Sequence, residues 1–284
     1  MSNADTSCSL EPEPIPAPAS EFHTVSWNRP PTPSGLRAVP EETAVALTYN
    51  GTTHAVMMAT PTDLEDYAVG FSLTEGQIER AEQIRSIDIA AFATGIDVRI
   101  WLDAETADNF RDRRRRIVGP TGCGLCGIES LVEAVPAPRA VADETRFGAS
   151  AILKAQAQMF DAQTLHAITS AVHAAAWWTA EEGLVAVRED VGRHNALDKL
   201  TGALARRTST SGPKDRSGIL LLTSRISVEM VQKAAVLGAP VIVAVSAPTA
   251  LAVRVAAGAG ITLAATARND AFDVYTHPER IVME

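Results

Sequence analysis

The second half of the chain contains short apolar runs that alternate with segments of helical length. The apolar runs are rich in Val, Ile and Leu and occupy residues 218–224, 240–247 and 261–267. The segments between them, 227–237 and 249–258, have the pattern of short helices. Because continuous apolar strands separated by helices are typical of parallel sheets covered on both faces, this half is predicted to be α/β. Sites in such sheets lie beyond the carboxyl ends of the strands.

Three further elements are predicted around this sheet. Residues 183–190 predict a strand, and residues 150–162 and 194–207 predict helices. The segment VHAAAW places His173 beside an apolar helix, where a single histidine is more often a packing residue than a catalyst.

The first half is predicted to be rich in β-hairpins. Two alternating segments flank Asn50-Gly51, a pair that favours the positive φ angles of a type I′ turn. A second hairpin is predicted around Thr94-Gly95. Between the two hairpins, a helix is expected to begin at Thr62, with Glu65 completing a capping box.

Proline and composition divide the chain into three predicted parts. Residues 1–40 contain 8 of the 16 prolines, so residues 1–39 are predicted to be a disordered tail, with one short strand around residues 23–27. Residues 40–134 are predicted to be a smaller β-rich part that carries a CxxC loop. Residues 135–284 are predicted to be an α/β cofactor-binding domain, which makes the fold class α/β.

Charge and cysteine content exclude several classes of protein. The 284 residues carry a formal net charge of -9, which argues against a general nucleic-acid coat protein. Three cysteines are too few for a disulfide-stapled secreted scaffold. The uncharged stretch 234–253 contains glycine and proline and is not expected to cross a membrane. With no signal-peptide pattern at its start, the protein is expected to be cytoplasmic.

The loop GPTGCGLCG at residues 119–127 contains the chain's CxxC pair, Cys123 and Cys126. Its glycines favour an exposed and mobile loop. Five arginines stand just upstream, in the predicted helix 105–116. Because nearby cations stabilise a thiolate, we interpret the loop as the site of a nucleophilic cysteine.

Other interpretations of the loop stay open on the sequence alone. A structural zinc site usually needs four ligands, and the remaining thiol is Cys8 in the proline-rich tail. A dithiol oxidoreductase normally carries its CxxC pair at the start of a helix that follows a strand. Two buried cysteines fit poorly with so many glycines. The arginine run by itself also fits a solvated helix face that pairs with Glu105 and Asp112.

The segment REDVGRHNALDKLTG, residues 188–202, combines a strand end, a glycine turn and a helix start. Free N–H groups at such a helix start bind anions, so Arg193 and His194 are candidate cofactor-binding residues. The alternative is a capped helix in which His194 and Asp198 satisfy one another at a spacing of four residues.

Two more turns, each between a strand and a helix, carry polar residues. They contribute the candidate binding residues Arg225, Ser246 and Thr249. Their hydroxyl groups could simply cap the helices, or the two turns together could form a nucleotide cradle. The one GxGxxG string, GCGLCG at residues 122–127, follows a predicted helix and not a strand, and the sequence has no GxxxxGK[ST], so ordinary dinucleotide and P-loop sites have no support.

Several segments together resemble the FdhD family, the formate dehydrogenase accessory sulfurtransferases. They occur in the family's order and cover residues 40–284. These segments are YNGTTHAVMMATPTDLEDYAVGFSLTEG, TGCGLCG, VHAAAW, EDVGRHNALDKL, SRISVEMVQKAA, AVSAPTALAV and VYTHPERI.

The resemblance implies a fold and a role for each matching segment. The fold would be a cytidine-deaminase-like core sheet with helices on both faces, without the deaminase zinc and without a resident metal. Cys123 matches the persulfide-bearing cysteine and Cys126 its less critical neighbour. The family's cofactor-binding loop corresponds here to Thr266, Ala267, Arg268, Asn269, Asp270 and Ala271. This stretch lacks the glycine and proline of the family's loop, which favours contacts through the backbone.

The resemblance also implies the reaction and the partners. The chain would take persulfide sulfur from a cysteine desulfurase and pass it to the molybdenum of the bis(molybdopterin guanine dinucleotide) cofactor, which formate dehydrogenase needs. It would act as a homodimer. Two rival hypotheses are a non-catalytic chaperone for the same cofactor and a thiol oxidoreductase that uses Cys123 and Cys126.

Overall fold

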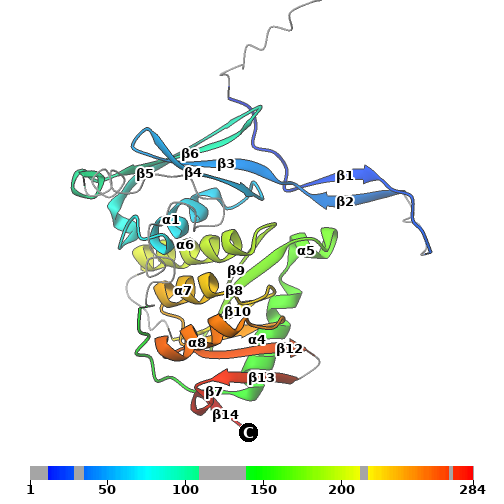
Figure 1. Cartoon of the computed structure of the whole chain (residues 1–284). Coiled ribbons are helices and arrows are strands. Elements are labelled where there is room, and N and C mark those ends of the chain that lie inside the picture. The colour runs from blue at the N-terminus through cyan, green and yellow to red at the C-terminus, as the bar shows by residue number, and fades with distance from the viewer. Residues whose placement is uncertain (1–11, 29–34, 109–138, 212–216, 269–270, 284) are drawn as a thin grey trace, which may run out of the picture.

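The structure is a computed structural model that describes residues 12–28, 35–108, 139–211, 217–268 and 271–283, with side chains described to residue 207 in the third range. Its strands form two larger sheets and two small ones. Figure 1 shows the four-stranded sheet of the first half above a pair of helices, and the six-stranded sheet of the second half below them.

The four-stranded sheet has the order β4-β3-β6-β5 and confirms both predicted hairpins. Its strands are β3 Thr43–Tyr49, β4 Thr52–Ala59, β5 Ile84–Phe92 and β6 Gly95–Leu102. Asn50 and Gly51 have φ angles of 46° and 79°, as a type I′ turn requires. A helix follows β6 at 104–108, at the start of the predicted helix 105–116. The rest of the predicted helix lies outside the described residues, and so does the loop that contains Cys123 and Cys126.

Helix α1, Leu64–Thr74, differs from its prediction at the first turn. The expected capping box at Thr62 and Glu65 is wrong, because the N-cap residue is Asp63 and makes no side-chain cap bond. Its backbone is left-handed, with φ 52°, and its Oδ1 lies 3.4 Å from Nε of Arg188. The short helix η1, Ala81–Gln83, leads into β5.

The six-stranded sheet has the order β13-β12-β11-β10-β8-β9. Its strands are β8 His173–Thr179, β9 Gly183–Asp190, β10 Ile219–Leu222, β11 Val241–Ala244, β12 Thr262–Arg268 and β13 Ala271–Thr276. Strands β10, β11 and β12 are parallel, as predicted, whereas β8, β9 and β13 pair antiparallel. The expected helix beside His173 is wrong, because His173 begins strand β8.

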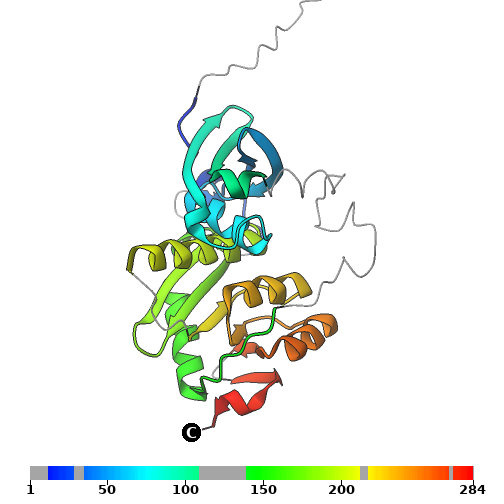
Figure 2. The same ribbon diagram turned by 90° about the vertical axis from the view of Figure 1, so that its left-hand side faces the viewer.

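Helices cover both faces of this sheet, as Figure 2 shows from the side. Helices α6 Arg193–Ser211, α7 Val228–Leu237 and α8 Ala250–Ala259 pack on the face that carries Leu220 and Leu222. Helix α4, Ala149–Asp161, packs on the face that carries Ile219 and Leu221. This alternation follows from the two-residue period of a strand and explains why the apolar runs are continuous.

Smaller elements complete the described chain. They are β7 Phe147–Gly148, α5 Thr164–Thr169, η2 Pro278–Arg280 and β14 Ile281–Val282. Strands β7 and β14 pair in parallel. Among the described residues, no helix combines the length and the apolar character that crossing a bilayer requires.

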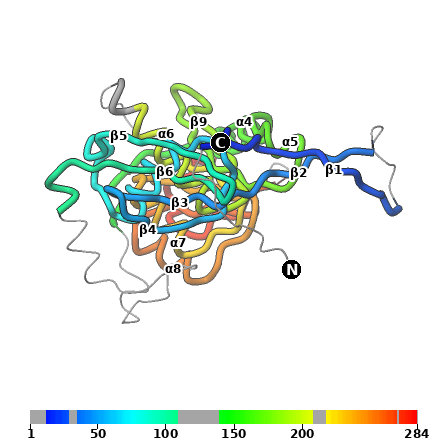
Figure 3. Tube along the Cα trace, turned by 90° about the horizontal axis from the view of Figure 1, so that it is seen from above, coloured from blue at the N-terminus to red at the C-terminus, as the bar shows by residue number. Residues whose placement is uncertain are grey.

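The proline-rich start of the chain contains a two-stranded ribbon. Strands β1 Ala19–His23 and β2 Leu36–Pro40 pair antiparallel and project from the body (Figures 1 and 3). The prediction of disorder through residue 39 is therefore wrong for these strands, and the expected strand at 23–27 lies four residues too late. The ribbon forms because its backbone groups pair across the strands, and the N–H of Glu41 extends this pairing to the carbonyl of Pro18 at 2.8 Å.

Helices α1 and α6 join the two larger sheets. They approach so closely that a Cβ atom built on Gly70 would lie 1.7 Å from the carbonyl oxygen of Asp198. A Cβ atom built on Gly202 would lie 1.9 Å from the carbonyl oxygen of Asp66. The division into parts at 40–134 and 135–284 stays a prediction, although the two larger sheets draw their strands from these separate ranges.

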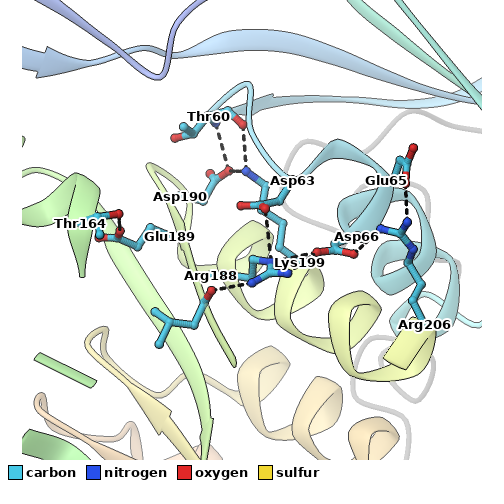
Figure 4. A network of polar contacts seen from close by, with 11 residues as sticks. Thr60, Asp63, Glu65, Asp66, Thr164, Arg188, Glu189, Asp190, Lys199 and Arg206 are labelled. Carbon is cyan, nitrogen blue, oxygen red and sulfur yellow. Dashed lines mark hydrogen bonds and ion pairs between the residues drawn. The ribbon is translucent and has the colours of Figure 1, made fainter. Parts of the chain in front are cut away.

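Ion pairs link the same region, as Figure 4 shows. Asp66 accepts hydrogen bonds from Arg188 at 2.6 Å and from Arg206 at 2.6 Å. Lys199 lies 2.7 Å from Asp190, and both side chains are fully buried. Lys199 also donates to the carbonyl oxygen of Thr60 at 2.8 Å. Polar groups thus connect the β4–α1 segment to β9 and α6.

Candidate functional site

The turns that follow the parallel strands β10 and β11 lie side by side. Ile226 forms a parallel bridge with Pro248, and the N–H of Thr249 donates to the carbonyl oxygen of Ile226 at 2.9 Å. The N–H of Thr266, near the end of β12, donates to the carbonyl oxygen of Ser246 at 3.4 Å. Because parallel strands end at one edge, the three predicted binding segments form one continuous rim.

Strands β8 and β9 extend this rim on the other side. Because β8 runs antiparallel to β10, its first residue, His173, lies at the edge where β10 ends. His173 pairs with Asp190, the last residue of β9, and helix α6 begins three residues later at Arg193. Arg193 and His194 therefore belong to the same edge as the turns after β10 and β11.

The described candidate residues differ in exposure along this edge. Arg225, Thr249, Arg268 and Ala271 are exposed, whereas Arg193, His194, Ser246 and Thr266 are half-buried and Ala267 is buried. Asn269 and Asp270, between β12 and β13, lie outside the described residues, as do both cysteines of the CxxC loop. The structure thus places the described candidate residues along one edge of the six-stranded sheet.

Two hydroxyl residues have structural roles at the edge. The Thr249 hydroxyl caps helix α8 by accepting a hydrogen bond from the N–H of Ala252 at 3.2 Å, which is the capping interpretation of that turn. Thr266 has a left-handed backbone with φ 54°, which is costly for a β-branched residue, and its hydroxyl donates to Asp273 at 2.6 Å. Thr266 thus holds the irregular end of β12, where the register with β13 shifts between Ala265 and Arg268, without a glycine.

His194 and Arg193 carry buried polar atoms without partners among the described residues. These atoms are Nε2 of His194 and Nε of Arg193. Burial, followed by the positive charges of Arg193 and Lys233, lowers the pKa of His194 from its ordinary value to about 4. At neutral pH the imidazole is uncharged, so it offers a hydrogen bond and Arg193 supplies the positive charge. A buried polar group without a partner usually has a ligand or an ordered water beside it.

The alternative interpretation, in which His194 pairs with Asp198, is wrong. Asp198 instead accepts hydrogen bonds from the Thr74 hydroxyl at 2.7 Å and from Nζ of Lys233 at 2.9 Å. Asp198 is fully buried and turned towards α1 and α7, because these two helices supply the donors that a buried carboxylate needs. The segment 188–202 therefore has two groups of polar residues: Arg193 and His194 at the edge, and others that join the helices.

The second group also includes Asn195. Its amide donates to the carbonyl oxygen of Met58 at 2.8 Å and to Asp190 at 3.0 Å, and its oxygen accepts from the Tyr67 hydroxyl at 3.0 Å. These contacts are all within the protein. Asn195 therefore fixes the start of α6 against the first half of the chain.

Sequence reasoning missed Lys233 and Glu75 near this site. Nζ of Lys233 lies 2.7 Å from the Glu75 carboxylate, at the end of α1. The available signal was a single lysine within the apolar stretch VEMVQKAAVL, because a charge on a buried helix face needs a partner. The sequence could not show that the partner comes from the first half of the chain.

The chain matches one protein family over most of its length. A family model described as the FdhD/NarQ family matches residues 40–282. A protein of Agrobacterium fabrum called "Sulfur carrier protein FdhD" is 52% identical over 254 residues, which are 88% of this chain and 91% of that one. A protein of the same name from Cupriavidus necator is 48% identical over 285 residues, 98% of each chain.

A solved structure is also similar. It is the crystal structure of a putative formate dehydrogenase accessory protein from Desulfotalea psychrophila, which matches with a TM-score of 0.68 and 26% sequence identity. The match covers 94% of this chain and 100% of that one.

Proposed function

This chain belongs to the FdhD/NarQ family, and from that membership we propose that it is a sulfurtransferase that passes persulfide sulfur to a molybdenum cofactor. The donor is a cysteine desulfurase, and the acceptor is the molybdenum of the bis(molybdopterin guanine dinucleotide) cofactor that formate dehydrogenase requires. The observation that carries the proposal is that the family model spans both Cys123 and Cys126, while relatives about half identical to this chain are called sulfur carriers.

The loading step needs only a thiolate and a donor persulfide. The Cys123 thiolate attacks the terminal sulfur of the donor persulfide, a new S–S bond forms at Cys123, and the donor cysteine leaves as a thiolate. No oxidant is needed, because one persulfide replaces another.

The edge of the six-stranded sheet supports the cofactor half of the proposal. We propose that Arg193, Arg225 and Arg268 bind the phosphates of the cofactor, since guanidinium groups form charge-assisted hydrogen bonds with phosphate. His194, Ser246 and Thr249 contribute neutral polar groups to the same edge. Residues 266–271 contribute backbone contacts, which fits the rigid left-handed conformation of Thr266.

Four further expectations belong to the proposal. The six-stranded sheet, with helices on both faces, is compatible with a cytidine-deaminase-like core. The protein acts in the cytoplasm as a homodimer, and formate dehydrogenase is the protein that receives the finished cofactor.

Replacement of Cys123 tests the proposal in cells. We expect Cys123→Ala to abolish formate dehydrogenase activity in a strain that depends on this protein, because no thiolate can then accept the sulfur. Cys8→Ala is the matched control and should retain full activity, since Cys8 precedes the family match. Full activity of the Cys123→Ala strain would show that the sulfur does not pass through this cysteine.

A labelling experiment separates the carrier from the chaperone hypothesis. The edge geometry by itself fits either, because both need a cofactor-binding surface. After incubation with a cysteine desulfurase and [³⁵S]cysteine, a carrier gains label on Cys123 that dithiothreitol removes. A chaperone gains none, and a thiol oxidoreductase instead forms a Cys123–Cys126 disulfide that equilibrates with glutathione.

A further inference from the structure

Lys233 has more negative charge around it than it needs for neutrality. Its Nζ atom lies 2.9 Å and 3.1 Å from the two carboxylate oxygens of Asp198 and 2.7 Å from one oxygen of Glu75. It also donates to the Thr74 hydroxyl at 2.9 Å. Burial lowers the pKa of Lys233, but Asp198 and Glu75 outweigh that effect and raise it, so the ammonium group stays charged.

The two carboxylates are held very differently. The Asp198 side chain is 2% exposed and accepts a second hydrogen bond from Thr74, so it is a fixed counter-ion. The Glu75 side chain is 44% exposed, follows the last residue of α1, and meets Lys233 through one oxygen. Lys233 and Asp198 already cancel in charge, so Glu75 leaves the cluster with a net charge of about minus one.

This cluster lies beside the candidate cofactor edge. Helices α1 and α6 run antiparallel, so the end of α1 with Glu75 meets the first turns of α6, where Arg193 and His194 lie. In addition to burial and Arg193, Lys233 lowers the pKa of His194, whereas Glu229 and, to a smaller extent, Glu75 raise it, so these charges lie within electrostatic reach of that ring. The first half of the chain therefore contributes a negative charge to the edge where an anionic ligand is expected.

We propose that Glu75 is an exchangeable counter-ion of Lys233, and that a ligand diphosphate bound at Arg193 and His194 replaces it. The inference rests on the proposed cofactor function of this edge and adds a residue that controls ligand affinity. When the site is empty, Glu75 accepts a hydrogen bond from the Lys233 ammonium group beside those that Asp198 and Thr74 accept, because a buried donor without a partner is costly. When a diphosphate arrives, Glu75 turns towards solvent, where its carboxylate is well solvated, and Lys233 supplies a further positive charge to the ligand.

Titration of the full-length protein with guanosine diphosphate tests this role. Calorimetry should show that Glu75→Gln binds this probe about two- to fivefold more tightly than wild type. The variant removes a partly exposed carboxylate that competes with the diphosphate for Lys233. The matched control is Glu65→Gln, at the other end of α1. Glu65 is 52% exposed and pairs with Arg206, away from the edge, so this variant should bind like wild type.

Lys233→Gln provides a second measurement. It should weaken binding, and in the double variant Glu75→Gln/Lys233→Gln the gain from Glu75→Gln should disappear, because no buried cation remains for the ligand. Circular dichroism and the midpoint of urea unfolding show whether each variant is folded. If Lys233→Gln does not fold, Glu75→Gln and its control still decide the question.

The possible outcomes separate this inference from the function beneath it. If wild type binds guanosine diphosphate and Glu75→Gln binds it equally or less tightly, the counter-ion role is wrong and the cofactor edge stands. If neither wild type nor any variant binds the probe, the cofactor edge itself is wrong, and the role of Glu75 with it.

Discussion

His194 lies at the edge of the six-stranded sheet, and its surroundings lower the pKa of its imidazole. The residue is half-buried with its Nε2 atom covered, and the positive charges of Arg193 and Lys233 stand nearby. The segment EDVGRHNALDKL indicated a polar helix start, and the structure confirms that a helix, α6, begins at Arg193. The partners of Asp198 could not be predicted, because they come from residues more than thirty positions away in either direction.

The charge state of His194 gives a prediction about pH. Burial and the two nearby cations hold the pKa of His194 at about 4 in the folded protein, below its ordinary value of 6.5. Between these values the unfolded chain binds a proton that the folded chain does not, so stability is lost as pH falls from 6.5 towards 4. Between pH 7 and pH 5, wild type should lose on the order of 1–2 kcal/mol more unfolding free energy than His194→Gln.

Urea unfolding of both proteins at the two pH values measures this difference. An NMR titration of the ring is an independent check, and its signals should stay those of a neutral imidazole down to about pH 5. Equal losses for wild type and His194→Gln, with a ring that titrates near pH 6.5, would contradict the buried neutral state.

At the scale of elements, the predicted strands and helices agree with the structure where the hydrophobic pattern was long and regular. The strand at 183–190, the helix at 227–237 and the hairpin at Asn50-Gly51 are confirmed. The errors fall where a short segment depends on distant contacts. Residues 174–178 are apolar throughout, so periodicity alone does not distinguish a buried strand from a buried helix.

The crossing of α1 and α6 gives a prediction at this scale. A Cβ atom on residue 202 would lie 1.9 Å from the carbonyl oxygen of Asp66 and 2.8 Å from the backbone nitrogen of Gly70, so the helices must separate. We expect Gly202→Ala to lower the unfolding free energy by about 3 kcal/mol or more. The control is Gly258→Ala in α8, where no atom lies within 4 Å of the new Cβ.

Chemical denaturation of the two variants provides the comparison. The control should be stabilised by about 0.5–1 kcal/mol, because alanine favours a helix over glycine. A Gly202→Ala protein as stable as wild type would mean that the two helices do not meet as closely as the structure indicates.

At the scale of the whole molecule, a buried ion pair and the α1–α6 crossing make the two halves depend on one another. Lys199 of α6 lies between Asp190 of β9 and the carbonyl oxygen of Thr60, and the backbone N–H of Thr60 also donates to Asp190 at 3.0 Å. Because these groups are removed from water, each needs its partner. The four-stranded sheet and the six-stranded sheet are therefore expected to unfold together.

Lys199→Met tests this dependence. The variant leaves Asp190 buried without its counter-ion and should lose about 3–5 kcal/mol of unfolding free energy. The control is Arg99→Met, which breaks an ion pair with Asp97. Because the Arg99 side chain is 42% exposed, this variant should lose less than about 1 kcal/mol of unfolding free energy. Circular dichroism and tryptophan fluorescence should give one coincident transition for wild type, whereas two separate transitions would show that the halves fold independently.

The sequence by itself determined most local elements, the parallel centre of the second half and the segments that meet at the candidate cofactor edge. These follow from hydrophobic period, turn residues and the ends of apolar strands, which are all properties of neighbouring residues. The ribbon of β1 and β2 was missed because the pairing of its two strands depends on residues far apart in a proline-rich segment, and composition does not record that pairing.

Only the tertiary structure decided which polar residues of segment 188–202 face the edge of the sheet and which face the junction of the two halves. Arg193, His194 and Lys199 occupy one short segment, yet the first two have unpartnered atoms at the edge and the third is fully paired beneath β4 and α1. The side of a helix on which each residue lies is set by the helical period. Which element meets that side depends on contacts over more than a hundred residues, and no local pattern records them.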